Sequence, residues 1–176
     1  MVNNPAEQQQ DDKTKYRFAV ITMSDKGSQG QREDTSGKSL VKMFLEMGYE
    51  LCHYSVVPDQ IPFIIETVLE AIENDQADLV LTTGGTGVSP SDVTPEAMDQ
   101  VIEKEVPGIS EAMRAASLAV TPYAVVSRGR SGIRGESLII NLPGSRKAAL
   151  ENISVIVPAL RHTLDKIKGS MSDCAV

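Results

Sequence analysis

The residues best suited to chemistry follow one apolar run in the middle of the chain. Leu79–Thr83 is rich in aliphatic and β-branched residues, which is typical of a strand buried on both faces. The segment 84–87 then reads GGTG, where missing Cβ atoms let backbone N–H groups approach an anion and the threonine hydroxyl adds a donor. Thr94, expected to cap the next helix, and Pro95, expected at its first position, follow shortly. This succession predicts a phosphate-binding turn between a strand and a helix.

The glycine spacing leaves a simpler interpretation open. GGTG matches neither the P-loop pattern nor the GxGxxG pattern, because no lysine follows the glycines and their spacing differs. A tight strand-to-helix turn without a ligand therefore explains these residues as well.

Positive charge is concentrated in one short segment, although the chain as a whole is acidic. Arg128, Arg130 and Arg134 lie close together among glycines and serines. The formal net charge of −7 argues against nucleic acid as the main partner, because a phosphodiester backbone is bound chiefly through clustered Lys and Arg. The three arginines are candidate phosphate-binding groups, since a guanidinium can bind phosphate through two hydrogen bonds. A solvated hairpin is the alternative interpretation of the same segment.

Length and composition indicate one globular domain, expected over residues 16–168. The segment 1–15 is polar, lacks the apolar core of a signal peptide and is expected to be a disordered arm, and 169–176 is expected to be a flexible tail. The longest apolar runs fall short of the ~20 residues that span a bilayer, so no membrane association is expected. Cys52 and Cys174 lack metal-ligand spacing, which indicates a reducing, cytoplasmic location.

Apolar periodicity along the chain switches repeatedly between the strand pattern and the helix pattern. Pro158 interrupts the last helical stretch and is expected to split or kink it. Strands are expected over 17–22, 50–57, 79–83, 123–127 and 137–140, and helices over about 36–48, 61–72, 109–119 and 149–167. A further helix is expected to begin at Pro95 and to end before Pro107.

This alternation predicts an α/β fold with a mostly parallel, twisted sheet and helices on both faces. In such sheets ligands bind beyond the carboxyl ends of the strands. The loops expected to converge on that edge are 24–35, 58–59, 84–92, 128–135 and 141–146.

Five segments, in one order along about 17–168, together resemble the molybdopterin adenylyltransferase family of the MogA/MoaB type. The same domain occurs as the G domain of gephyrin. Each segment alone is weak, but the five in register are specific. The segments are TMSDKGS at 22–28, VPD at 57–59, TTGGTG at 82–87, DVTPEA at 92–97 and NLPGS at 141–145.

The resemblance implies a three-layer α/β/α fold, usually trimeric, with a hexamer as the other expected assembly. It implies adenylylation of molybdopterin by ATP with Mg²⁺ as the metal, and transfer of the product to a molybdenum-insertion enzyme. The two aspartates critical in the family correspond to Asp59 and Asp92, which are therefore the expected catalytic and metal-binding residues. This assignment suits the chemistry, because Mg²⁺ commonly takes one or two carboxylates together with substrate phosphates.

The resemblance also suggests which residues bind the pterin or the nucleotide, whereas the three arginines are inferred from local charge alone. The expected binding residues carry hydroxyls, a carboxylate or the backbone of a tight turn. They are Ser24, Asp25, Ser28, Thr83, Gly84, Gly85, Thr86, Gly87, Pro143, Gly144 and Ser145.

Structural interpretations of the same residues stay open at this point. Asp59 precedes a predicted helix and would serve as its N-cap, and Asp92 would form an Asx-turn. His53 and His162 lack a nucleophile at motif spacing and are expected to be structural. At the level of function, one alternative is a non-catalytic oligomeric protein that binds or carries molybdopterin. Another is an unrelated phosphate-binding enzyme, because a fold alone does not determine function.

Overall fold

The fold is built on a six-stranded sheet with the strand order β2-β1-β3-β6-β5-β4. A computed structural model describes residues 15–170, so the expected arm (1–15) and tail (169–176) fall almost wholly outside the described residues. The four neighbouring strands β2, β1, β3 and β6 are parallel to one another, whereas β5 is antiparallel to both β6 and β4. The strands are β1 (Arg17–Met23), β2 (Glu50–Val57), β3 (Leu79–Thr83), β4 (Lys104–Glu105), β5 (Ser131–Arg134) and β6 (Ser137–Leu142).

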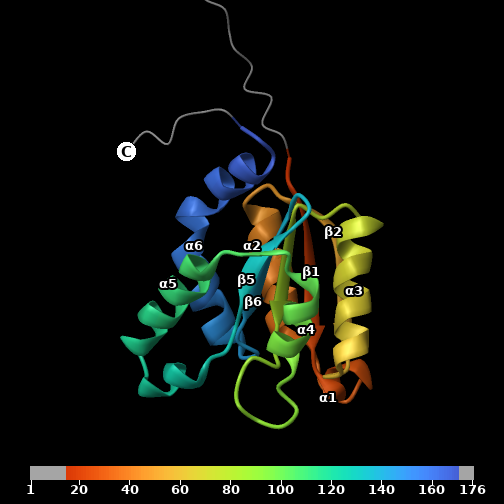
Figure 1. Cartoon of the computed structure of the whole chain (residues 1–176). Coiled ribbons are helices and arrows are strands. Elements are labelled where there is room, and N and C mark those ends of the chain that lie inside the picture. The colour runs from red at the N-terminus through yellow and green to blue at the C-terminus, as the bar shows by residue number, and fades with distance from the viewer. Residues whose placement is uncertain (1–14, 171–176) are drawn as a thin grey trace, which may run out of the picture.

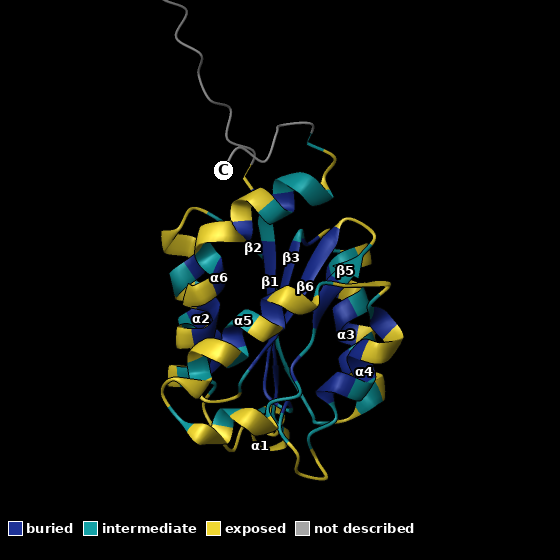
Figure 2. Ribbon diagram, turned by 60° about the vertical axis from the view of Figure 1, so that its left-hand side comes forward, coloured by how far each residue is buried: buried dark blue, intermediate teal, exposed yellow. Residues whose placement is uncertain are grey.

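Alternating side chains of the central strands form a separate hydrophobic core on each face of the sheet. Helices cover both faces (Figure 1), and the central strands between them are buried (Figure 2). On one face Phe18 and Val20 pack with side chains of α2 (Thr35–Glu46), α5 (Pro107–Leu118) and α6 (Arg146–Ile167). On the other face Ala19 and Ile21 pack with side chains of α3 (Ile61–Glu73) and α4 (Thr94–Val101). Because β1, β3 and β6 are covered on both faces, their sequences are almost continuously apolar. The predicted three-layer α/β/α fold is confirmed.

Two short segments differ from the expected elements. The expected strand at 123–127 is wrong, because Pro122–Val126 forms a 3-10 helix, η1, in which the Thr121 side chain accepts a hydrogen bond from the backbone N–H of Tyr123. The segment 25–28, expected to be irregular, forms a one-turn helix, α1 (Asp25–Ser28). In addition, β5 occupies part of the expected arginine loop and pairs with the two-residue β4.

Pro158 lies inside α6, which runs continuously for 22 residues, so the expected split into two helices is wrong. The Pro158 side chain is exposed, whereas Ala149, Ile153, Leu160 and Leu164 form a fully buried stripe along the same helix. Burial of this stripe holds the helix together despite the hydrogen bond that a proline cannot donate.

The parallel strands place their carboxyl ends at one edge of the sheet, where α1 and the loop after β3 lie (Figure 1). The first and last described residues lie at the opposite edge (Figure 1). At that edge the Tyr16 hydroxyl donates a hydrogen bond to Asp165, near the end of α6. Along residues 15–170 no helix has the length and hydrophobicity needed to cross a membrane.

Replacing the internal proline of α6 tests how far packing alone sustains this helix. Pro158→Ala is expected to raise the free energy of unfolding by about 1–3 kcal/mol, because alanine restores a backbone donor at an exposed position. Urea unfolding measures the change. Pro107→Ala is the control, since proline is favourable at the first position of α5 and its removal should give no gain. A loss of stability in Pro158→Ala would contradict the expectation.

Candidate functional site

Residues 84–87 after β3, here called the glycine turn, begin in a conformation that only glycine adopts easily. Gly84 and Gly85 have φ angles of +105° and +61°. A Cβ at Gly84 would lie 2.4 Å from the backbone oxygen of Met23, and a Cβ at Gly85 would lie 2.4 Å from the hydroxyl oxygen of Thr94. The backbone of this turn therefore packs directly against its neighbours.

Two threonines fix this turn from both sides. The fully buried Thr94 donates from its hydroxyl to the backbone oxygen of Gly84 (2.9 Å) and from its N–H to that of Gly85 (3.1 Å). The hydroxyl of Thr83 donates to the backbone oxygen of Pro143 (2.7 Å). Thr94 does not cap α4 as expected, because its hydroxyl is committed to the turn, and Val93 occupies the cap position without a side-chain bond.

Asp59 lies in the turn between β2 and α3 and is paired with α1. Its carboxylate accepts the backbone N–H of Asp25 (2.9 Å), and its own N–H donates to the Asp25 carboxylate (3.0 Å). Gln60, not Asp59, occupies the cap position of α3, so the helix-cap interpretation is wrong. Burial raises the pKa of Asp59 above its ordinary value, and the negative charges of Asp25 and Asp92 act in the same direction.

Asp92 closes the loop that joins the glycine turn to α4. Its carboxylate accepts the N–H of Ser89 (2.8 Å), and its N–H donates to the Ser89 backbone oxygen (2.9 Å). An Asx-turn would use the N–H two residues on, but that N–H, of Thr94, binds Gly85. The Asx-turn interpretation is therefore wrong, although the carboxylate does order its own loop.

One cavity of about 750 Å³ opens at the carboxyl edge of the sheet and brings the two aspartates together. Its walls come from the ends of β1, β2, β3 and β6, which is where the topology places a ligand. The predicted site residues that line it are Ser24, Asp59, Thr83, Gly84, Gly85, Asp92, Gly144 and Ser145.

The other residues predicted from the motifs lie next to this cavity. Asp25 contacts Asp59, and Ser28 donates its hydroxyl to the backbone oxygen of Asp25 within α1. Thr86, Gly87 and Pro143 line a second cavity of about 270 Å³, together with residues of η1 and α6. The glycine turn is therefore a wall shared by two cavities.

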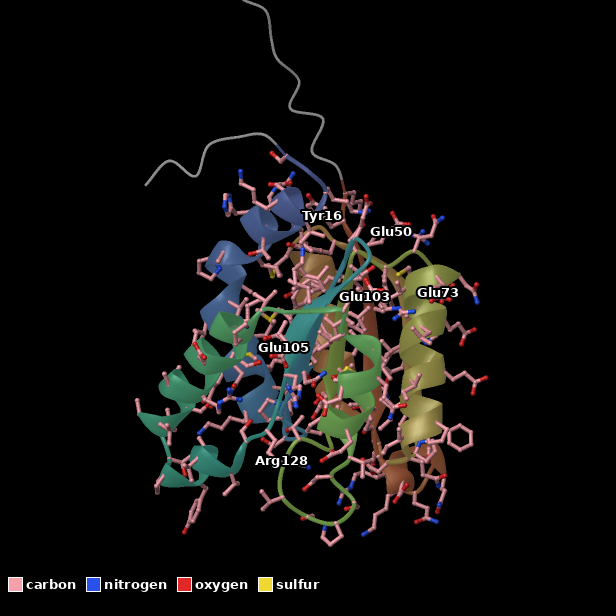
Figure 3. The ribbon with its side chains drawn as sticks, viewed as in Figure 1. Tyr16, Glu50, Glu73, Glu103, Glu105 and Arg128 are labelled. Atoms are coloured by element: carbon pink, nitrogen blue, oxygen red, sulfur yellow. The ribbon has the colours of Figure 1, made fainter. Side chains whose placement is uncertain are left out.

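None of the three arginines predicted to bind phosphate lines the 750 Å³ cavity. Arg130 pairs with Asp99 (2.7 Å) and with Glu105, which lies on β4. Arg134 pairs with Glu73 (3.3 Å) and Glu103 (3.6 Å). Figure 3 shows Glu73 and Glu103 toward the end of the sheet opposite the glycine turn.

Arg128 lies close to the glycine turn (Figure 3) and holds the loop that follows this turn. Its guanidinium donates to the backbone oxygens of Gly87 (2.7 Å) and Asp92 (2.6 Å), the two ends of the loop between them. It also pairs with Glu96 on α4 and thereby lowers the pKa of that carboxyl. These contacts favour the structural interpretation of the arginine segment over phosphate binding.

Three further charged residues of the cavity, which were not among the expected site residues, lie at or shortly before helix starts. Asp34 caps α2 by accepting the N–H of Gly37 (2.8 Å), and it also accepts the hydroxyls of Thr22 (2.7 Å) and Tyr54 (2.8 Å). Burial and the bond to Asp34 raise the pKa of Tyr54. An aspartate just before a helical stretch is a recognisable cap signal. Arg32 and Arg146 also line the cavity, from the α1–α2 loop and the first position of α6.

A cation at this site would have to take ligands from a substrate as well as from the protein. In the described part of the chain, no group of three or more His, Cys, Asp or Glu side chains is arranged to hold a metal ion. Two neighbouring carboxylates, Asp59 and Asp92, are what Mg²⁺ commonly takes from a protein when phosphates complete its coordination.

Comparison with known proteins identifies relatives of the whole domain. A family model described as a probable molybdopterin binding domain matches residues 19–162. The chain is 41% identical over 157 residues to the molybdopterin adenylyltransferase of Helicobacter pylori, covering 87% of this chain and 88% of the relative. It is also 41% identical to gephyrin of Dictyostelium discoideum, over 85% of this chain but only 22% of that protein. The structure of the molybdopterin biosynthesis enzyme MoaB from Thermus thermophilus superposes with a TM-score of 0.82 at 41% identity, covering 88% of this chain and 98% of that one.

A methyl group on the glycine turn tests the close packing found there. Gly84→Ala is expected to lower the free energy of unfolding by more than the control Gly48→Ala. Gly48 also has a positive φ (+87°), but no atom lies within 4 Å of the place that an added methyl group would take, so its replacement should cost only the ~1–2 kcal/mol of backbone strain. Urea unfolding of both variants gives the comparison. Equal losses would show that contact with the Met23 oxygen is unimportant.

Proposed function

The chain belongs to the family of molybdopterin-binding domains and is a molybdopterin adenylyltransferase, and we propose the reaction by which it acts. AMP is transferred from ATP to the terminal phosphate of molybdopterin in a Mg²⁺-dependent step. The observation that carries this proposal is the meeting of Asp59, Asp92 and the glycine turn in one cavity at the carboxyl edge of the sheet.

In the proposed reaction, an oxygen of the molybdopterin phosphate attacks the α-phosphorus of ATP. A new bond forms between them, the bond from the α-phosphorus to the bridging oxygen breaks, and pyrophosphate leaves with that oxygen. Such transfers need alignment of the reacting groups and neutralisation of charge more than they need covalent help from the protein. A rigid turn of backbone beside two carboxylates suits both requirements.

The carboxylates of Asp59 and Asp92 suit a divalent cation. Each accepts a backbone N–H, but neither has a cationic partner within residues 15–170. The raised pKa of Asp59 reflects burial and neighbouring negative charge, and both penalties are relieved when a cation binds. Bound Mg²⁺ would neutralise charge on the triphosphate and on the leaving pyrophosphate. The hydrogen bonds from Asp25 and Ser89 hold the two carboxylates ready for this role.

The glycine turn would hold phosphate oxygens through its backbone. Thr94 and Thr83 hold the turn through backbone oxygens, so its conformation is set by the fold and binding a ligand would cost less entropy. Around this cavity, Ser24, Gly144 and Ser145 offer further polar groups for the pterin or the nucleotide.

A non-catalytic molybdopterin carrier is the second candidate function. It would use the same cavity, but a carrier has no need of two carboxylates that lack cationic partners. We place the reaction in the cytoplasm, where ATP and Mg²⁺ are available, and expect the adenylylated product to pass to a metal-insertion enzyme.

We also propose that the protein acts as a homotrimer. The face formed by Leu118, Val120, Tyr123, Val125 and Val126, here called the η1 face, exposes large apolar side chains at the end of α5 and along η1. Tyr123 and Val125 are 81% and 70% exposed. A contiguous apolar face of this kind is typical of a protein–protein interface. A second copy of the chain is the occupant that the family resemblance favours.

Replacing each aspartate tests the proposed reaction. Asp59→Asn and Asp92→Asn are expected to lower pterin-dependent pyrophosphate release from ATP and Mg²⁺ by more than ~100-fold, because even outer partners of metal ligands cost 10–100-fold. Asp99→Asn, whose carboxylate pairs with Arg130 outside the cavity, should retain activity. Thermal unfolding should show that Asp59→Asn is at least as stable as the unmodified protein, since the amide removes a buried charge. Tight pterin binding without pyrophosphate release by the unmodified protein would favour the carrier.

The assembly is tested by a charge placed on the η1 face. Light scattering during gel filtration should give three times the monomer mass for the unmodified protein and a lower mass for Val125→Asp. Leu45→Asp is the control, because Leu45 is also half-exposed but lies on α2. A sixfold mass would indicate the hexamer. A monomeric unmodified protein would exclude the proposed interface.

A further inference from the structure

The 750 Å³ cavity contains side chains of both charges that do not neutralise one another. We propose that two of them, Arg32 and Arg146, bind phosphate oxygens of the substrates, which assigns the anion-binding residues of this site. This inference rests on the reaction proposed above. Both side chains line the cavity, and neither forms an ion pair or a side-chain hydrogen bond with any residue in the range 15–170.

The negative charges of the cavity fall into two groups. Glu33 pairs with Lys38 (2.8 Å), and Asp34 is used by the cap of α2 and by two hydroxyls. Asp59 and Asp92, in contrast, accept only backbone N–H groups. The cavity therefore presents two carboxylates and two guanidinium groups without partners of opposite charge among the described residues.

The opposite charges come from different elements around the cavity. Arg32 comes from the loop before α2 and Arg146 from the start of α6, whereas Asp59 and Asp92 follow β2 and β3. A phosphate group bound to a divalent cation carries both charges. It satisfies the carboxylates through the cation and the guanidinium groups through its oxygens.

The position of Arg146 on its helix supports an anionic ligand. It is the first residue of the 22-residue α6, where a helix carries partial positive charge from its unpaired N–H groups. A cation there adds to this charge instead of offsetting it, and is unfavourable unless an anion binds nearby. Arg146 and the next residue, Lys147, are both exposed, but Lys147 does not line the cavity, and its Nζ lies 3.8 Å from the Glu151 carboxylate one turn along the helix.

The arginines of the 128–134 segment show the contrasting case. Arg128, Arg130 and Arg134 each pair with at least one carboxylate, and none of them lines this cavity. Because these three guanidinium groups are already paired with carboxylates, Arg32 and Arg146 are the arginines available to bind phosphate.

The test compares binding of phosphates to the full-length protein and its variants. Isothermal titration with Mg²⁺-ATP and with Mg²⁺-pyrophosphate gives the dissociation constants, and pyrophosphate release at varied molybdopterin gives KM and kcat. Arg146→Gln and Arg32→Gln are each expected to weaken phosphate binding by about 10–100-fold, the usual effect of losing hydrogen bonds to a charged group. Arg146→Lys should recover part of the loss, and Lys147→Gln should behave as the unmodified protein.

The two titrants and KM distinguish which phosphate is bound. Weaker binding of both ATP and pyrophosphate would assign the arginines to the triphosphate, whereas a raised KM for molybdopterin alone would assign them to its phosphate monoester. Unchanged dissociation constants and unchanged KM in both glutamine variants would overturn the inference while leaving the proposed reaction intact. Failure of the unmodified protein to bind ATP or release pyrophosphate would overturn both. Thermal unfolding followed by circular dichroism confirms that each variant is folded.

Discussion

The close contact between the backbones of Gly84 and Met23 is the constraint on which the site depends. It brings the end of β3 against the end of β1 so closely that no side chain fits between them. Gly144, from the turn after β6, packs against the same place, since a Cβ there would lie 3.2 Å from the Cα of Gly84. Three strand ends therefore meet with only backbone between them. The cavity beside them is lined by residues of these strand ends and of the adjacent loops.

Many of the side-chain hydrogen bonds around the site stabilise this backbone arrangement. Thr94 and Arg128 both donate hydrogen bonds to backbone oxygens of the segment between β3 and α4. These bonds are made within the fold and do not depend on a ligand. The side chains left with unused charge are then the ones to consider for substrate binding.

The central parallel strands, the helices that cover them, and the edge at which the strands end could be predicted from the sequence. The central strands are aliphatic on both faces, and parallel strands necessarily end at one edge, so Asp59 and the glycine turn had to converge. Side-chain partners could not be predicted in this way. Arg128 and Glu96 are 32 positions apart, and no local pattern shows that they pair. The segment Pro122–Val126 resembles a strand in sequence because it is a run of apolar residues. It forms a 3-10 helix instead, and its large side chains lie exposed on the surface.

The two ends of the described chain lie at the edge of the sheet farthest from the cavity (Figure 1). A further domain joined at either end would therefore start at the edge of the sheet opposite the cavity. Domains with this geometry are readily fused to others, because the linker crosses no functional surface. The gephyrin of Dictyostelium and the cinnamon protein of Drosophila, in which the matching region makes up 22% and 26% of the chain, are longer proteins of this kind. The same domain thus occurs over most of the length of some relatives and as a small part of others.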